Sequence, residues 1–359
     1  MNALSPGSTV GIIGGGQLGR MLAMAAARLG YRTVILEPEP DCPAAQVANR
    51  QIIAPYDDSA ALDELASLAD VVTYEFENVP VDAAERLAGR VPVFPPPRAL
   101  DVSQDRLKEK GFLNGCGIST ARFHPVDNDG DMSAALRAFG GNGVLKTRRL
   151  GYDGKGQRVF RASAPAAIAG IYPAMGGVPL IMEEFVPFTQ EVSVIAARGR
   201  DGALAAFDLG ENVHRDGILR RSTVPANAGA AIAEAARRAA FRLLEALDYV
   251  GVIGVEFFVT KDGGLLANEF APRVHNSGHW TEAACAVSQF EQHIRAVAGL
   301  PLGSPERHSN GVMENLIGDD VAKAGALLGE PNVLVHLYGK KEVRPGRKMG
   351  HFTRIAPKA

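Results

Sequence analysis

The alternation of apolar and polar positions predicts a chain that begins with a βαβ unit. Residues 9–13, TVGII, form a short apolar run typical of a buried strand. Apolar residues then recur at helical spacing from Leu18 to Leu29, Gly30 ends this helix, and a second apolar run follows at residues 31–36. This order predicts a Rossmann-like α/β domain, which binds its ligands at the carboxyl ends of parallel strands.

The pattern changes after a proline-rich stretch at residues 92–97, which predicts a domain boundary. Before it, a strand over residues 70–77 should place Glu75 and Glu77 on one face. Near the other end of the chain, residues 282–300 should form one long helix. Further expected elements are a charged helix from Asp105, strands at 144–146, 179–186, 190–196 and 333–338, an amphipathic helix at 228–247, and loops with His214, Arg220 and Arg221. The fold class is therefore mixed, α/β at the start and α+β afterwards.

A hairpin predicted late in the chain brings two carboxylates together. Apolar runs at residues 252–259 and 265–270 flank Lys261-Asp262-Gly263-Gly264, which is typical of an Asp-Gly turn. If the loop has two residues, Glu256 lies directly opposite Glu269. Like charges at such positions are destabilising unless a cation lies between them. The alternative is two unrelated, solvated acids, but Glu256 stands in a run too apolar for an exposed strand.

The donors around this carboxylate pair are mainly oxygen atoms, which favour Mg²⁺ or Mn²⁺ over zinc. Asn268 adds a neutral oxygen donor beside Glu269. Arg273, His275 and Asn276 follow directly, so the same stretch also carries cationic and hydrogen-bonding groups. It therefore predicts a site for a divalent metal ion, with further polar side chains close by.

The motif Gly14-x-Gly16-x-x-Gly19 opens the first helix, whose free backbone N–H groups would suit an anion. Glu37 ends the next strand, where dinucleotide folds place a ribose-binding acid. A motif of this kind alone leaves three interpretations open. They are some other phosphate, a nicotinamide or flavin dinucleotide, and a purely structural turn.

Two further stretches have the composition of phosphate-binding loops. Residues 151–157, GYDGKGQ, follow Lys146 on its predicted strand, and their glycines would let backbone N–H groups close over phosphates. An ordinary glycine hairpin is the alternative. Residues 340–348 carry five basic side chains, which suits either a phosphate grip or a solvated turn.

Composition limits the partners and the compartment. The 359 residues carry a net charge of −2, with 46% hydrophobic and 22% charged residues, so we expect a soluble protein that binds neither nucleic acid nor membranes. Its three cysteines lack C-x-x-C spacing, and its N-terminus lacks the features of a signal peptide. No apolar run reaches the roughly 18 residues of a membrane span. We therefore expect a cytoplasmic protein.

Taken in order, the strand lysine, the glycine-rich loop, Glu183-Glu184 and the paired carboxylates resemble the ATP-grasp family. More narrowly, GGGQLGRM at 14–21, GYDGKGQ at 151–157, NEFAPRVHNSGHWT at 268–281 and EVRPGRKMGH at 342–351 are similar to the N5-carboxyaminoimidazole ribonucleotide synthetase family of purine biosynthesis. The likeness runs from about residue 11 to about residue 351. Four motifs in one order make it far more specific than the first glycine motif alone.

The resemblance implies three units: a Rossmann-like domain over residues 1–100, an ATP-grasp core of two subdomains over 101–297, and a small β-containing domain over 298–359. It implies a ligase that uses ATP, bicarbonate and two Mg²⁺ ions, with Mn²⁺ as a substitute, to carboxylate aminoimidazole ribonucleotide through carboxyphosphate. We expect these small molecules as its partners, and a homodimer as its assembly.

The resemblance also implies roles for individual residues. Those implied for catalysis are Arg273, His275, Asn276 and Lys340, with Lys341 as the alternative to Lys340, and those implied for metal are Glu256 and Glu269. Those implied for ATP are Arg106, Lys146, Tyr152, Asp153, Gly154, Lys155, Gly156, Gln157, Glu183, Glu184, Phe185, Val186, Glu191, His214, Asn268 and Glu269. Those implied for the ribonucleotide are Gly15, Gly16, Gln17, Leu18, Glu75, Tyr152, Asp153, Lys340 and Arg347, with Glu77 as the alternative to Glu75.

Three rival functions stay open on the sequence. A nicotinamide- or flavin-dependent oxidoreductase would use the first domain, but it leaves the carboxylate pair and the 151–157 loop without a function. A catalytically silent nucleotide-binding protein would not need every phosphate and metal group. Within the ATP-grasp class, a formate-using or biotin-carboxylating ligase is the close alternative.

Overall fold

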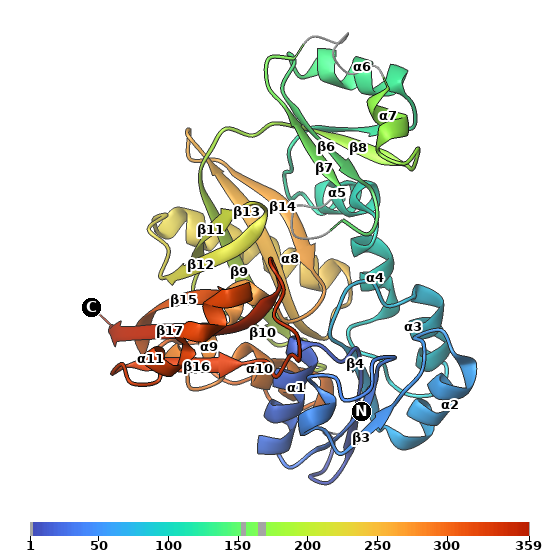
Figure 1. The fold of residues 1–359 in the computed structure, drawn as a ribbon, viewed down its shortest axis with the longest axis vertical. Helices are drawn as coiled ribbons and strands as arrows, with labels where there is room; N and C mark the ends of the chain where they lie inside the picture. The colour runs from blue at the N-terminus through green and yellow to red at the C-terminus, as the bar shows by residue number, and fades with distance from the viewer. Residues whose placement is uncertain (1–2, 152–155, 164–169, 359) are drawn as a thin grey trace.

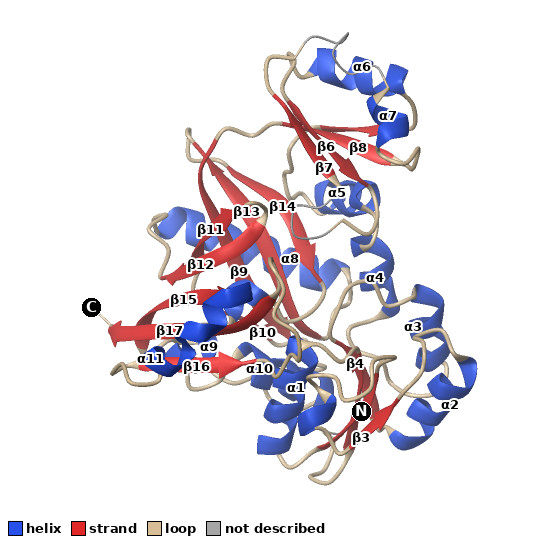
Figure 2. Cartoon of the chain, viewed as in Figure 1, coloured by secondary structure: helices blue, strands red, loops and turns tan. Residues whose placement is uncertain are grey.

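The computed structural model describes residues 3–151, 156–163 and 170–358, which form three sheets with helices packed around them (Figure 1). Figure 2 shows that strands dominate the second half of the chain. The strands are β1 (Thr9–Ile13), β2 (Arg32–Leu36), β3 (Arg50–Ile52), β4 (Val71–Tyr74), β5 (Phe123–Val126), β6 (Gly143–Thr147), β7 (Gln157–Phe160), β8 (Leu180–Glu184), β9 (Phe188–Arg198), β10 (Leu204–Ala206), β11 (Gly210–Arg215), β12 (Ile218–Val224), β13 (Gly251–Thr260), β14 (Leu265–Ala271), β15 (Ser309–Ile317), β16 (Val333–Leu337) and β17 (Lys348–Pro357). The helices are α1 (Gln17–Arg28), α2 (Ser59–Leu68), α3 (Val81–Ala88), α4 (Pro97–Ser103), α5 (Arg106–Gly115), α6 (Asp129–Ala138), α7 (Ile171–Ala174), α8 (Ala230–Ala246), α9 (Thr281–Ala284), α10 (Gln289–Ala298) and α11 (Ala324–Leu327), with short 3₁₀ turns η1 (Ala45–Val47), η3 (Asn276–Gly278) and η4 (Gly318–Lys323).

The first sheet is parallel, in the order β3-β2-β1-β4, and confirms the predicted Rossmann-like start. Successive residues of β1 point to opposite faces. Ile12 is buried in one core cluster with Leu22 of α1, whereas Ile13 is buried in another with Leu65 of α2. Helices therefore cover both faces, which leaves the ends of the strands as the free edge for a site.

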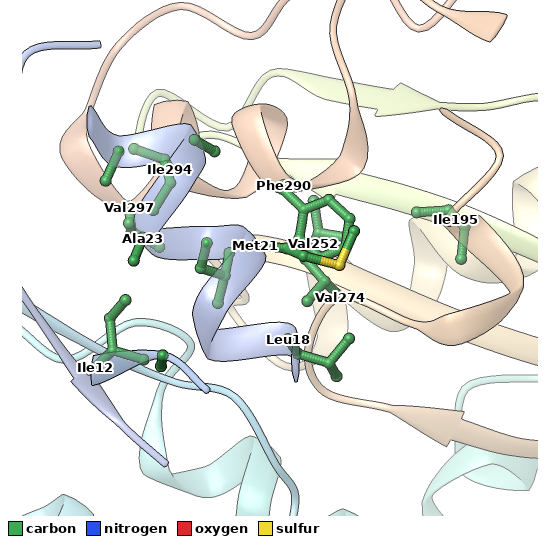
Figure 3. Packing of buried hydrophobic residues seen from close by; sticks show 14 of the residues in the cluster. Ile12, Leu18, Met21, Ala23, Ile195, Val252, Val274, Phe290, Ile294 and Val297 are labelled. Atoms are coloured by element: carbon green, nitrogen blue, oxygen red, sulfur yellow. The ribbon is translucent and has the colours of Figure 1, made fainter. Parts of the chain in front are cut away.

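The core continues from this first unit into the rest of the molecule. Leu18 and Met21 of α1 pack with Phe290 of α10 and Val252 of β13 in one cluster (Figure 3). Each large apolar side chain that is fully buried contributes about 1.5–3 kcal/mol. This packing fixes the carboxyl end of β1 against the second sheet, so residues from both units can line one site.

The second sheet has nine strands, in the order β14-β13-β9-β11-β12-β15-β17-β16, with β10 on the far part of β9. The C-terminal strands β15, β16 and β17 thus extend the sheet that carries the predicted hairpin, because β15 pairs with β12. The third sheet is smaller and antiparallel, in the order β5-β8-β6-β7. With α6 and α7 it projects from the rest at the top of Figure 1.

The long helix predicted over residues 282–300 is wrong, because the structure has two helices there. Helix α9 ends at Ala284, and Cys285 is extended and forms a bridge with Arg307. Ser288 then caps α10 by accepting a hydrogen bond from the N–H of the third helical residue (3.2 Å). Apolar periodicity runs across the break because the residues on both sides of it are buried.

Two other expectations about strands are wrong for the same reason. The bounds of a strand depend on hydrogen bonds to other strands, which can be far away in sequence. The strand predicted over residues 70–77 ends at Tyr74, so Glu75 and Glu77 follow it and share no strand face. His214 and the pair Arg220-Arg221, expected in loops, lie within β11 and β12, which pair with each other. Among the helices of the described residues, none is both long and apolar enough to cross a membrane.

Candidate active site

A cavity of about 530 Å³ lies between the three sheets, a size within the roughly 300–1,000 Å³ of small-molecule sites. Glu75 after β4, Lys146 on β6 and Glu256 on β13 line it from three sides. The predicted site residues that line it are Gln17, Leu18, Glu75, Arg106, Lys146, Gly156, Gln157, Glu183, Glu184, Phe185, Val186, Glu191, His214, Glu256, Asn268, Glu269, Arg273, His275 and Asn276. Tyr152, Asp153, Gly154 and Lys155 lie outside the described residues.

The hairpin β13–β14 pairs Glu256 with Glu269, as predicted, but by a different route. The N–H of Thr260 donates to the carbonyl of Gly264 (2.9 Å), so the loop has three residues and the predicted two-residue turn is wrong. A three-residue loop alone would move the register by one. An extra residue in β14, Asn268, restores it, because Phe257 pairs with Ala267 while Glu256 pairs with Glu269.

The two paired carboxylates have opposite electrostatic environments. Burial raises the pKa of Glu256 to about 7, and the charge of Glu269 adds to this effect, although His214 opposes it. Burial would also raise the pKa of Glu269, but Arg106, whose Nη1 lies 2.9 Å from its Oε2, lowers it to about 2. Arg106 therefore favours the charged form of Glu269, whereas burial disfavours the charged form of Glu256.

The residues around this pair fit a hard divalent cation. The side-chain oxygen Oδ1 of Asn268 is buried and has no hydrogen-bond partner within the described part of the chain. Two carboxylates and an unpartnered amide oxygen form an all-oxygen donor set of the kind that Mg²⁺ and Mn²⁺ prefer. A cation would also keep Glu256 ionised against the effect of burial.

Two lysines, Lys146 and Lys110, lie beside this carboxylate pair. Lys146 was predicted as a site residue, whereas Lys110 was not. Glu183 Oε2 lies 3.0 Å from Nζ of Lys146 and 3.1 Å from Nζ of Lys110, and Lys110 also donates to the carbonyl of Asn268 (3.1 Å). Burial would raise the pKa of Glu183, but the two lysines lower it to about 2. The carboxylate of Glu183 thus positions lysines rather than contacting a base. Lys110 was missed because its helix looks solvated in sequence.

The loop before η3 and the first residue of η3 carry the predicted anion-binding residues. Arg273 Nε lies 2.6 Å from Oε2 of Glu77 and therefore has a fixed orientation. Burial, together with the charge of Arg273, lowers the pKa of His275 to about 3, so this imidazole is neutral at pH 7. Both side-chain polar atoms of Asn276 are buried without a hydrogen-bond partner in the described residues. Such groups indicate a place for a ligand.

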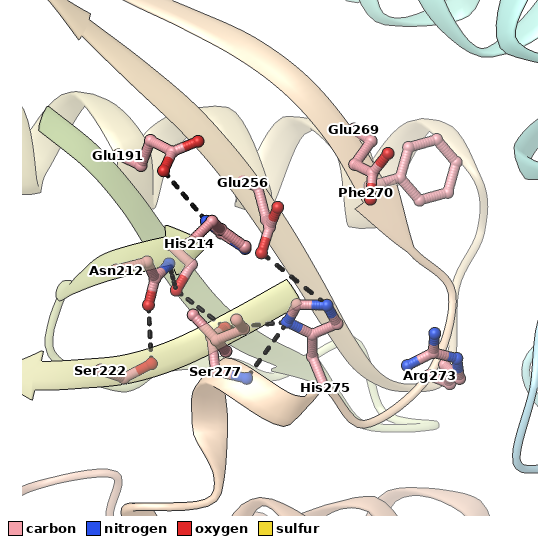
Figure 4. A network of polar contacts seen from close by, with 12 residues as sticks. Glu191, Asn212, His214, Ser222, Glu256, Glu269, Phe270, Arg273, His275 and Ser277 are labelled. Carbon is pink, nitrogen blue, oxygen red and sulfur yellow. Dashed lines mark hydrogen bonds and ion pairs between the residues drawn. The ribbon is translucent and has the colours of Figure 1, made fainter. Parts of the chain in front are cut away.

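The position of His275 is set by residues that the sequence did not single out. Its Nδ1 lies 2.8 Å from Oγ of Ser277, its backbone N–H donates to Oε1 of Gln289 (2.9 Å), and its Nε2 lies 3.9 Å from Glu256. Figure 4 shows Glu256 between the rings of His214 and His275, with Glu269 on the neighbouring strand. Glu77, Ser277 and Gln289 thus support the predicted residues from behind.

On the other side of Glu256, His214 Nδ1 lies 3.0 Å from Oε2 of Glu191. Burial would lower the pKa of His214, but the contact with Glu191 and the charge of Glu256 raise it overall. Beyond this pair, the stacked rings of Phe188 and Phe258, 4.7 Å apart, form a flat apolar wall. Such a wall suits a planar base. Phe185 and Val186 follow β8 beside it, whereas Glu184 turns to Arg122 (2.6 Å).

The first glycine motif does not offer free N–H groups at the positions expected. The N–H of Gly15 donates to Glu37 Oε2 (2.8 Å), and those of Gly16 and Gly19 donate to Oε1 and Oε2 of Glu75 (2.6 and 2.9 Å). These amides already bind carboxylates of the protein, so they are not free in this structure, and the role predicted for Gly15 and Gly16 stays a prediction. Neither glycine lines the cavity, although Gln17 and Leu18 do.

Residues 340–348, the basic tail, lie next to the cavity, and several of their side chains contact other groups of the protein. Lys340 Nζ donates to the carbonyl of Lys348 (2.8 Å), Lys341 pairs with Asp41 (3.1 Å), and Arg347 donates to the carbonyl of Glu342 (3.1 Å). Lys340 and Arg347 are not among the lining residues, whereas Lys348, which was not predicted, is. The charge run 340–348 was the signal for it, but composition did not show which lysine turns inward.

Three family models match successive parts of the chain. Residues 111–290 match the ATP-grasp domain, residues 7–104 the ribonucleotide synthetase preATP-grasp domain, and residues 311–359 the phosphoribosylaminoimidazole carboxylase C-terminal domain. The matched core and a cavity that joins a strand lysine to paired carboxylates define the class of the protein, which is an ATP-grasp ligase. The fold class predicted from sequence is confirmed.

Known relatives narrow the class. An N5-carboxyaminoimidazole ribonucleotide synthase of Brucella melitensis is 66% identical over 356 residues, which cover 99% of this chain and 98% of that protein. The structure of an N5-carboxyaminoimidazole ribonucleotide synthetase with ADP matches at a TM-score of 0.94 and 40% identity, over 99% of this chain and 94% of that one. An Aspergillus clavatus synthase in complex with ADP and 5-aminoimidazole ribonucleotide matches at 0.91 and 33%, over 98% and 94%.

The chain therefore belongs to the N5-carboxyaminoimidazole ribonucleotide synthase family. The resemblance inferred from the four sequence motifs is confirmed. Membership also removes the oxidoreductase alternative, in agreement with the engaged N–H groups of the first glycine motif.

Proposed function

We propose that the chain carboxylates 5-aminoimidazole ribonucleotide to N5-carboxyaminoimidazole ribonucleotide, with ATP and bicarbonate as co-substrates. The observation that carries the proposal is that one cavity holds the carboxylate pair, the strand lysine Lys146 and the Arg273-to-Asn276 loop. Phosphoryl transfer needs cations around the γ-phosphate, and bicarbonate needs a cation and hydrogen-bond donors beside it. Both requirements meet at Glu256 and Glu269.

ATP would lie with its base against Phe185, Val186 and the Phe188–Phe258 wall, and with its phosphates toward Lys146 and Arg106. The contact between Lys146 and Glu183 (3.0 Å) keeps that ammonium in place before nucleotide binds. The pair Glu191 and His214 would hold the ribose end of the site. Gly156 and Gln157 line the same cavity and would contact the phosphates, together with residues 152–155, which lie outside the described residues.

Glu256, Glu269 and Asn268 would hold two Mg²⁺ ions, for which Mn²⁺ can substitute. When bound, these ions neutralise the charge of the transferring phosphoryl group. Arg106 contributes before that by keeping Glu269 ionised, since its charge holds the pKa of this carboxyl at about 2. Asn268 contributes an oxygen that no described group occupies.

Arg273 and Asn276 would bind bicarbonate and carboxyphosphate. Because His275 is neutral, with a pKa lowered to about 3, Arg273 supplies the charge, and His275 acts as a hydrogen-bonding group. A bicarbonate oxygen attacks the γ-phosphorus and ADP leaves. The exocyclic amine of the ribonucleotide then attacks the carboxyl carbon, loses a proton, and expels inorganic phosphate. Burial of the site protects carboxyphosphate from water.

The ribonucleotide would lie near Glu75, Gln17 and Leu18, with Lys340 beside its ring and Arg347 at its phosphate. The tail lies close enough to the first unit for this, since Lys341 contacts Asp41 (3.1 Å). We assign residues 1–100, 101–297 and 298–359 to the three units of the chain. The enzyme would act as a homodimer in the cytoplasm, where purine precursors are made.

The reaction class is tested by ADP release in carbon-dioxide-depleted buffer. ADP should form at full rate only when bicarbonate and aminoimidazole ribonucleotide are both added, and formate should not replace bicarbonate. A rate that is independent of bicarbonate, or equal with formate, would contradict the proposal. An activity that needs biotin instead of the ribonucleotide would assign the chain to the biotin-carboxylating alternative.

A further inference from the structure

A cluster of metal-ligating side chains lies outside the cavity, between α9 and the C-terminal strands. His336 on β16 lies directly opposite His351 on β17, and Glu282 on α9 lies beside them. One ligand atom of each residue lies within 4.8 Å of the other two, and His336 Nε2 is 3.1 Å from Oε2 of Glu282. None of the three lines the catalytic cavity. The proposed reaction therefore gives this cluster no task.

The polar atoms of the cluster are poorly satisfied. Glu282 Oε2 and His336 Nε2 are buried, and neither has a hydrogen-bond partner among the described residues, because their mutual contact lacks hydrogen-bond geometry. No lysine or arginine of the described residues forms an ion pair with Glu282. Buried polar groups left in this state cost about 1–3 kcal/mol each unless a ligand, ion or water satisfies them.

We propose that Glu282, His336 and His351 form a binding site for one borderline divalent transition-metal ion, of which Zn²⁺ is the prime candidate. Two imidazoles and a carboxylate are a donor set that Zn²⁺ and its neighbours in the first transition row bind well. Mg²⁺ disfavours imidazole ligands, so the site differs in metal preference from the all-oxygen site at Glu256 and Glu269.

The surroundings orient His351 as metal sites usually require. Its Nδ1 lies 2.8 Å from the hydroxyl of the buried Tyr338, and this contact fixes the angle of the ring. The rings of His336 and His351 are stacked, with centroids 4.8 Å apart and an angle of 8° between their planes. His279 packs against His351 at 4.6 Å and limits its rotation. The hydrogen bond and the packed rings hold His351 in a fixed orientation.

The spacing requires only a small closure on binding. Donor atoms of a tetrahedral zinc site are about 3.3 Å apart, given bonds of about 2.0–2.1 Å. Two of the three donors already lie 3.1 Å apart, and the side chains of Glu282 and His336 are 19% and 18% exposed, so the cluster lies near the surface. A bound ion would join α9 to β16 and β17, so metal binding should stabilise the C-terminal strands.

The test is titration of metal-free, full-length protein with Zn²⁺, and with Co²⁺ for its visible spectrum, without nucleotide or Mg²⁺. Glu282→Gln and His336→Gln each remove one ligand and keep similar volume. His308→Gln is the matched control, since His308 is exposed and lies outside the cluster. Glu256→Gln controls for transition metal bound at the catalytic carboxylates. Thermal melting with and without metal provides a second readout that is independent of activity.

We expect one equivalent of Zn²⁺ to bind the wild type and raise its melting temperature. Either ligand variant should lower the affinity at least about tenfold and abolish the shift in melting temperature. His308→Gln and Glu256→Gln should bind as the wild type does. Absence of saturable binding, equal binding by all variants, or loss of binding only in Glu256→Gln would overturn the proposal. Should one ligand variant fail to fold, the other decides the outcome.

Discussion

The glycine motif at residues 14–19 and the hairpin β13–β14 both bring carboxylates into a buried, polar place, and they compensate the charge in opposite ways. In the glycine motif, Glu37 and Glu75 accept hydrogen bonds from the N–H groups of Gly15, Gly16 and Gly19. In the hairpin, Glu256 has a pKa raised to about 7 by burial, and Asn268 keeps a buried oxygen without a partner among the described residues. Burial raises the pKa of Glu75 as well, but its carboxylate oxygens have backbone donors, whereas the hairpin keeps a buried polar atom without a partner in the described part of the chain.

The difference shows what a motif does and does not reveal. A glycine motif at a helix start predicts N–H groups that bind an anion, and here these groups bind carboxylates of the protein itself. Which anion these N–H groups bind depends on the positions of Glu37 after β2 and Glu75 after β4, and the motif alone does not predict those positions. Unsatisfied buried groups are the better indication of a ligand site, because folded proteins rarely leave them without a partner.

The largest expected effect comes from substituting Glu269 in the hairpin. We expect Glu269→Gln to reduce ADP formation at least about a hundredfold, because the hairpin then lacks one of the two charges that would hold metal. The protein should still fold, since glutamine keeps an oxygen for Arg106. Glu245→Gln, an exposed carboxylate on α8, is the control and should be as active as the wild type. Near-normal turnover of Glu269→Gln at saturating Mg²⁺ would contradict the metal assignment.

Because the amides of Gly15 and Gly16 are engaged, the ribonucleotide phosphate should depend on the basic tail. Arg347→Ala should raise the KM for the ribonucleotide by about 10- to 150-fold, the effect of losing a charge-assisted contact of about 1.5–3 kcal/mol. The KM for ATP should change far less. Arg344→Ala, three residues earlier and exposed, is the matched control. Equal increases in both KM values would show that the tail binds elsewhere.

Loss of the Glu75 carboxylate, which the glycine motif binds, should lower the stability of the protein. In Glu75→Gln the amide nitrogen faces one of two backbone donors, so a buried N–H loses its acceptor. We expect a loss of about 1–3 kcal/mol in the free energy of unfolding, measured by urea denaturation. The exposed Glu39→Gln should unfold as the wild type does. Unchanged stability in Glu75→Gln would mean that the motif does not depend on its internal carboxylate.

The smallest effect concerns Glu109, which lies behind the hairpin and accepts a hydrogen bond from the N–H of Phe270 (2.8 Å). Burial, and then the charge of Glu269, raises its pKa to about 8, whereas an unfolded glutamate titrates near about 4.3. The folded protein therefore holds a proton that the unfolded chain releases, and stability falls as pH rises between these values.

Glu109→Gln keeps the acceptor and removes this titration. The variant and the wild type should melt at similar temperatures near pH 5, and the variant should be more stable by at least about 2 °C near pH 8. Differential scanning fluorimetry across this range measures the difference. A gap that does not change with pH would show that Glu109 is already ionised in the folded state.

Much of the fold and part of the site could be predicted from sequence. Apolar periodicity located β1, α1, β6 and α8, because local pattern determines such elements. It failed between α9 and α10, where both neighbours of the break are buried, and at β11 and β12, whose hydrogen-bond partners are distant in sequence. The pairing of Glu256 with Glu269 was correct only because Asn268 compensates for the longer loop, which no short-range rule predicts.

The site residues that were missed share one property. Lys110 and Lys348 stand in stretches whose composition looks solvated, and only tertiary packing turns them inward. Conversely, the resemblance implies that Glu183 contacts ATP, whereas in the structure its carboxylate lies 3.0 and 3.1 Å from the ammonium groups of two lysines. Sequence motifs identified the stretches that form the site, but not which atoms within them face the ligand.

The central claim, that bicarbonate attacks ATP beside Glu256 and Glu269, is tested most directly with heavy oxygen. If a bicarbonate oxygen attacks the γ-phosphorus, that oxygen stays on phosphorus when carboxyphosphate breaks its C–O bond. We therefore expect one labelled oxygen per inorganic phosphate, measured by mass spectrometry before bicarbonate exchanges its label with water. Turnover to ADP and carboxylated product with unlabelled phosphate would contradict the mechanism and the roles given to Arg273, His275 and Asn276.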